Sequence, residues 1–178
     1  MSTLITPHGG YRNLKSFQNS TIVYDLTVIF CEKYLDRKSR TNDQMTQAAR
    51  SGRQNIAEGS QASGTSKKTE LKLISVARAS LEELLLDYED FLRQKGLVMW
   101  GKDDPRALKV RSLARTENMS HTTYMTYMDA PERIANALLC LIHQTNYLLD
   151  QQLRALEKQF LEEGGFTERL YRERKKRQ

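Results

Sequence analysis

Residues 70–96 read ELKLISVARASLEELLLDYEDFLRQKG, and the spacing of their apolar side chains decides the fold. Apolar residues recur there alternately three and four positions apart: Ile74, Ala77, Leu81, Leu84, Tyr88 and Phe91. Because an α-helix has 3.6 residues per turn, this spacing places all of them along one face. Ser66 is the expected N-cap and Gly96 the expected end, so the stretch predicts an amphipathic helix over about residues 66–96.

Three further segments show the same spacing and predict helices over about residues 12–36, 42–58 and 131–163. In the first of these, the expected core-facing positions are Leu14, Phe17, Thr21, Tyr24, Val28, Cys31 and Leu35. In the second, Thr41 or Asn42 is the expected N-cap and Gly59 the expected stop. In the last, Asn146 lies in the apolar seam, where it either fixes the packing register or faces solvent.

Four such helices without a convincing strand predict an all-α fold, an antiparallel up-and-down four-helix bundle. Residues 97–130 are expected to form an irregular insertion before the last helix, with a short helix over about 105–115 and a loop over 116–127. Residues 1–166 are then a single domain, and residues 167–178 a basic tail.

The charge of the chain lies mainly in that tail. The formal net charge is +6 over 178 residues, and residues 167–178 alone hold six basic and two acidic side chains. No stretch of the chain approaches the roughly 18 to 20 consecutive apolar residues of a membrane span, and the N-terminus lacks the pattern of a secretory signal. We therefore expect a cytoplasmic protein that does not bind membranes.

The sequence offers no convergent catalytic or metal-binding pattern. His8, His121 and His143 are isolated from one another, and His143 is expected to be partly buried or at an interface. The loop after Gly59 resembles a phosphate-binding loop only weakly, because Thr65 stands where such a loop has its lysine. The acidic residues over 82–90 are expected to form a solvated face or ion pairs between subunits. We expect a protein that is not an enzyme and has neither a cofactor nor a metal.

Basic residues are the candidate site, because Lys and Arg neutralise phosphates and release counterions. The candidates for nucleic-acid binding are Arg50, Arg53, Lys67, Lys68, Arg172, Arg174, Lys175, Lys176 and Arg177. Each group has an alternative. Arg50 and Arg53 could instead pair with acidic residues of another subunit, Lys67 and Lys68 could belong to a flexible connection, and the tail could be a disordered, solubilising terminus.

Residues 47–59, QAARSGRQNIAEG, resemble the signature of bacterial four-helix-bundle proteins first noticed as products of intervening sequences in large-subunit ribosomal RNA genes. Residues 76–84, VARASLEEL, resemble a second helix of that family, and the insertion and tail resemble its longer branch with a C-terminal suffix. The family is related to the accessory variability proteins of diversity-generating retroelements.

The resemblance implies a non-enzymatic homo-oligomer, a pentameric ring, that binds RNA or DNA and a protein partner such as a reverse transcriptase. The signature residues it marks for structural or subunit contacts are Asn55, Glu58, Gly59, Ser80 and Glu83. The alternative function is a scaffold for protein interaction that has no role with nucleic acid.

Overall fold

The computed structural model describes residue 5 and residues 7–176, and this part of the chain is helical and contains no strand. The all-α class is thereby confirmed. The α-helices are α1 (Lys15–Tyr34), α2 (Arg40–Ala62), α3 (Lys67–Gln94), α4 (Pro105–Leu113), α5 (Pro131–Glu163) and α6 (Phe166–Lys176), and the 3-10 helices are η1 (Tyr11–Asn13) and η2 (His121–Tyr127). None of the described helices is both long and apolar enough to cross a membrane.

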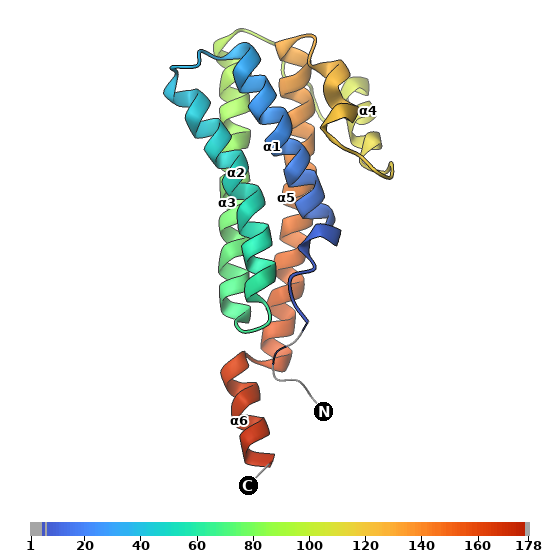
Figure 1. Ribbon diagram of the computed structural model, residues 1–178. Helices are drawn as coiled ribbons and strands as arrows, with labels where there is room; N and C mark the ends of the chain where they lie inside the picture. The colour runs from blue at the N-terminus through green and yellow to red at the C-terminus, as the bar shows by residue number, and fades with distance from the viewer. Residues whose placement is uncertain (1–4, 6, 177–178) are drawn as a thin grey trace.

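The four long helices lie side by side along one axis (Figure 1). Helix α2 packs against α1 and α3, and α5 packs against the same two helices. Helices α1 and α3 run toward one end of the molecule and α2 and α5 run back (Figure 1). Helix α4 and η2 pack against α5 at the first end, whereas α6 continues beyond the other end, past the α2–α3 connection (Figure 1).

The core face is as expected in α3 but not in α1. All six apolar positions expected in α3 are buried. In α1 the buried face runs through Val23, Leu26, Thr27 and Phe30, whereas most of the expected positions are only half-buried beside it. The expectation was wrong because α1 is apolar on more than one side. Spacing alone then cannot show which of two neighbouring apolar stripes of α1 is buried. The contacts of α1 with α2 and α5 determine the buried stripe.

Helix α2 is longer than expected at both ends. Ser39 is its N-cap and accepts a hydrogen bond from the Thr41 backbone N–H, in place of Thr41 or Asn42. At the other end the helix continues through Gly59, so Gly59 is not its stop. Gly59 is instead buried against α3, where an added Cβ would lie 3.3 Å from Ile74 Cδ1. Helix packing therefore holds this glycine in helical conformation.

The insertion contains the expected short helix and further order. Helix α4 begins at Pro105, as expected, and the Asp104 side chain caps it by accepting from the Arg106 backbone N–H. The segment expected as a loop contains η2, because Tyr124 and Tyr127 are buried and anchor it to the core.

Asn146 of α5 is buried between α5 and α3 and donates to the Glu82 carboxylate (3.3 Å), so it does not face solvent. His143, expected to be partly buried or at an interface, is exposed on the same helix, so partial burial within the chain is wrong and the interface remains a prediction.

Residues 166–176 form a helix, so the alternative of a disordered tail does not hold for this segment. Gly164 ends α5 with a φ of 74°, a conformation that favours glycine. The Glu168 carboxylate accepts from the Gly165 N–H at the start of α6, and basic residues fill its last turn. This order of charges complements the helix dipole. Arg177 lies outside the described residues.

Candidate nucleic-acid interface

Helix α6 carries the densest positive charge of the candidate site. It holds five basic residues, Arg169, Arg172, Arg174, Lys175 and Lys176, and two acidic ones, Glu168 and Glu173. Lys176 pairs with Glu173 (2.9 Å), but the exposed side chains of Arg172, Arg174 and Lys175 have no hydrogen bond or ion pair within the described residues. Three cations are thus available to an anion in solution.

The α2–α3 connection brings one more of the candidate cations to the same end of the molecule (Figure 1). Lys68, the second residue of α3, is exposed. Lys67 is different, because its ammonium lies 3.2 Å from the Glu70 carboxylate, and the two side chains are only 13% and 8% exposed. Burial raises the pKa of Glu70, and the Lys67 charge offsets part of that rise. Lys67 therefore serves the fold, and Lys68 is the residue of this pair that faces solvent.

Arg50 and Arg53 lie in the middle of α2 and have different surroundings. Arg50 is exposed, whereas the guanidinium of Arg53 stacks over the Tyr24 ring of α1 at 4.9 Å and donates to Gln54 (3.1 Å). The structure therefore places Arg53 in a contact between helices and leaves Arg50 open. Within the described part of this chain, neither pairs with the acidic residues over 82–90.

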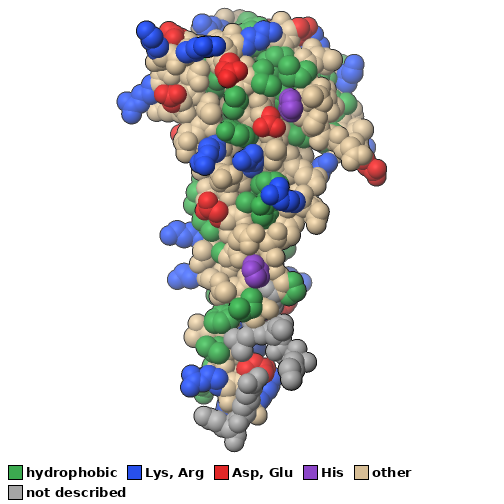
Figure 2. Space-filling view, viewed as in Figure 1, with side chains coloured by type: hydrophobic (Ala, Val, Ile, Leu, Met, Phe, Trp, Pro, Cys, Tyr) green, Lys and Arg blue, Asp and Glu red, His purple; other side chains and the backbone are tan. Residues whose placement is uncertain are grey.

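Sequence reasoning missed a second cluster of cations, at the α1–α2 connection. Arg37, Lys38 and Arg40 are exposed there, at the end of the molecule opposite α6. Figure 2 shows Lys and Arg side chains gathered around this end and further ones beside α6. The signal was present in the sequence. Positive charge just before and at the start of a helix opposes the helix dipole, so a run of cations there is not explained by helix stability.

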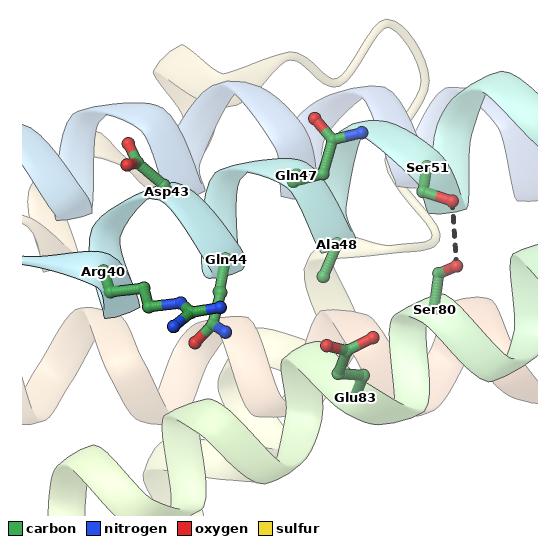
Figure 3. Close-up of a pocket in the computed structure, with 8 residues that line it drawn as sticks. All are labelled: Arg40, Asp43, Gln44, Gln47, Ala48, Ser51, Ser80 and Glu83. Carbon is green, nitrogen blue, oxygen red and sulfur yellow. Dashed lines mark hydrogen bonds between the residues drawn. The ribbon is translucent and has the colours of Figure 1, made fainter.

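Two of the five signature residues, Ser80 and Glu83, line an open cleft of about 490 Å³ where α2 meets α3 (Figure 3). Ser51 and Ser80 share a hydrogen bond of 2.9 Å across the two helices, and the Asn55 amide donates to the Ser51 carbonyl (2.9 Å). Arg40 and Gln44 point from α2 toward α3, and Glu83 points from α3 toward α2 (Figure 3). Ser80 therefore joins α3 to α2 through Ser51, and Asn55 supports Ser51 from within α2. Glu83 and Glu58 are exposed and remain open to a partner.

The described residues contain no group of three or more His, Cys, Asp or Glu side chains that could hold a metal ion. The two cysteines are buried and free, and burial raises the pKa of Cys31 to about 11. Because the thiolate is the reactive form, Cys31 is suited to packing and not to nucleophilic chemistry.

Comparison with models of protein families, with curated proteins and with solved structures gives no match.

Proposed function

We propose that this protein is a non-enzymatic helical protein that binds nucleic acid electrostatically, with α6 as the principal contact. The observation that carries the proposal is a set of three exposed cations on α6, Arg172, Arg174 and Lys175, which form no ion pair with any other described residue. Neighbouring like charges repel one another, and a polyanion relieves this repulsion while it releases counterions. Lys68 lies at the same end of the molecule and would add to this contact, and Arg50 and Lys176 are secondary contacts.

The finer architecture is part of the proposal. The alternating directions of α1, α2, α3 and α5 support an antiparallel up-and-down four-helix bundle. The sequence resemblance supports assembly into a homopentamer and a role as an accessory factor to a reverse transcriptase or another nucleic-acid enzyme. An oligomer would present several copies of α6 at once, and this multivalency would raise the affinity above that of a single helix.

The alternative is a scaffold for protein partners. It is favoured by the outer face of α3, where the Leu86 side chain is 53% exposed and Val76 is 39% exposed. Exposed aliphatic residues on one helix face are typical of an interaction surface. In this alternative the basic surface of α6 serves solubility or docking, and nucleic acid is not a ligand.

The test is binding of a fluorescein-labelled 30-nucleotide single strand and of the matching duplex, measured by anisotropy at 50 and 200 mM salt. If three phosphates of the duplex are neutralised, its affinity should fall about 40-fold across this range. The triple variant Arg172→Gln/Arg174→Gln/Lys175→Gln should lose most of that binding and most of its salt dependence.

The matched control is Arg37→Gln/Lys38→Gln/Arg40→Gln, which removes the same charge from the opposite end. If α6 is the principal contact, this variant retains more affinity than the α6 variant. Equal losses would show that only net charge matters and would refute the assignment to α6. No binding at 50 mM salt by the wild-type protein would refute nucleic-acid binding itself and leave the scaffold.

A further inference from the structure

A second cleft, of about 470 Å³, lies where α4 and the loop before it pack against α5. It is at the end of the molecule opposite α6 (Figure 1). Its apolar wall includes Trp100, Leu139 and Cys140, and its volume is that of a typical small-molecule site, roughly 300 to 1,000 Å³. The basic surface proposed above does not include it, so an inference about it is independent of nucleic-acid binding.

The wall of this cleft is fixed in place by hydrogen bonds. Asn136 of α5 accepts from the Trp100 backbone N–H (2.8 Å) and donates to the carbonyls of Val98 and Glu132 (2.8 Å each). On the indole itself, the Arg106 guanidinium lies 4.8 Å from the ring centroid. Arg106 in turn pairs with Asp104 (2.8 Å), so its charge is already compensated. The loop therefore presents a preorganised indole.

That indole has one unmet polar group. The Trp100 side chain is 9% exposed, and its Nε1 is buried without a hydrogen-bond acceptor among the described residues. An unsatisfied buried donor costs about 1–3 kcal/mol. The Asn136 side-chain oxygen already accepts from the Trp100 backbone N–H. Because this N–H is buried, it is a cost to the fold and not a contact that the open cleft offers to a ligand.

The lining of the cleft has an excess of positive charge. Lys102 and Arg111 lie there with His143, against the single carboxylate of Glu89. Arg111 donates one N–H to the Lys102 carbonyl, so the guanidinium is anchored and still has further N–H groups to offer. Neither cation has an ion pair within the described residues. A ligand with a negative group suits this lining better than a neutral or positive one.

We propose that this cleft binds a small aromatic carboxylate. The aromatic body packs against Trp100 and Leu139, and the carboxylate accepts from Arg111 or Lys102. This combination of an apolar wall with a few fixed polar groups is the usual chemistry of a small-molecule site. Arginine is the preferred partner of a carboxylate, because its planar fork donates two parallel hydrogen bonds.

Trp100 is the only tryptophan of the chain, so tryptophan emission originates in the wall of this cleft. The experiment titrates the full chain with dansylglycine, an aromatic carboxylate that accepts energy from tryptophan. Dansylamide, which lacks the carboxylate, is the matched ligand control. The expected result is saturable quenching of Trp100 emission by dansylglycine, with dansylamide at least about tenfold weaker.

Two variants locate the carboxylate. Arg111→Gln, and separately Lys102→Gln in the exposed loop, should weaken dansylglycine several-fold to about tenfold and leave dansylamide unchanged. Arg115→Gln, an exposed residue outside the cleft, should change neither affinity. Absence of saturable quenching overturns the proposal, as does equal binding of the two probes, or binding that neither variant weakens. Because no oligonucleotide is used, none of these results depends on the function proposed for α6.

Discussion

The contact between α2 and α3 gives a quantitative prediction for Gly52→Ala. Alanine is the better helix former by about 1 kcal/mol, so helix propensity alone predicts that this change stabilises the protein. In the structure, however, the added Cβ would lie 2.7 Å from Leu81 Cδ2 and 2.8 Å from Leu81 Cγ. Leu81 is fully buried, so its whole side chain would have to move within a packed core.

Overpacking of this kind costs about 1–3 kcal/mol, and the branch atom Cγ is involved, so we expect the upper part of that range. After the gain in propensity, the free energy of unfolding should fall by about 2 kcal/mol. For a chain of this size that corresponds to a Tm lower by roughly 4–8 °C. The measurement is chemical and thermal denaturation followed by circular dichroism, at one protein concentration because self-association would shift Tm.

Two further variants test the reasoning. Gly59→Ala lies in the same helix, but its Cβ would be 3.3 Å from the flexible end of Ile74, so stability should change by less than about 1 kcal/mol. In a Leu81→Ala background the obstructing side chain is gone, and Gly52→Ala should then stabilise by up to about 1 kcal/mol. If Gly52→Ala instead raises the stability of the wild-type protein, the close approach of α2 and α3 is refuted.

Two other perturbations test buried groups of α3. Tyr88→Phe removes the buried hydroxyl that donates to Thr27 Oγ1 (2.9 Å) and so joins α3 to α1. The free energy of unfolding should fall by about 1 kcal/mol. Because Thr27→Val removes the same hydrogen bond, the losses of the two variants should not add. Burial, with smaller contributions from Glu83 and Asp90, raises the pKa of Asp87, so the folded state binds this proton more tightly than the unfolded state does. Ionisation of Asp87 therefore lowers the stability of the folded state, and Asp87→Asn should raise Tm at pH 7. The difference in Tm between variant and wild type should vanish below about pH 4, where the carboxyl is protonated in both states. A difference in Tm that does not change with pH would contradict this.

Much of the fold could be predicted from the sequence. The range expected for the last long helix, residues 131–163, coincides with α5. The helix expected over residues 66–96 differs from α3 by one or two residues at each end. Helix formation depends on spacing and caps within a few residues, such as Ser66 and Pro131, and those are visible in any one stretch of sequence. The end of α2 could not be predicted, because burial of Gly59 against a distant helix overrode its local preference.

For the candidate site, the sequence could predict only which residues are positively charged. The sequence identified the cations of α6 but not which of the candidates would be engaged elsewhere. Lys67 and Glu70 are three residues apart on one helix, so this pair could have been anticipated. The stacking of Arg53 on Tyr24 could not, because the two residues belong to different helices and meet only when α1 and α2 pack.

The sequence by itself determined that this protein is helical, where its long helices lie and that its C-terminal end is basic. These properties depend on local spacing, caps and composition. Only the tertiary structure decided which face of α1 is buried, which cations remain free for a partner, and that Trp100 stands against Leu139 and Arg111 in one cleft. Such features arise from side chains far apart in the chain, whose contacts are set by the packing of whole helices.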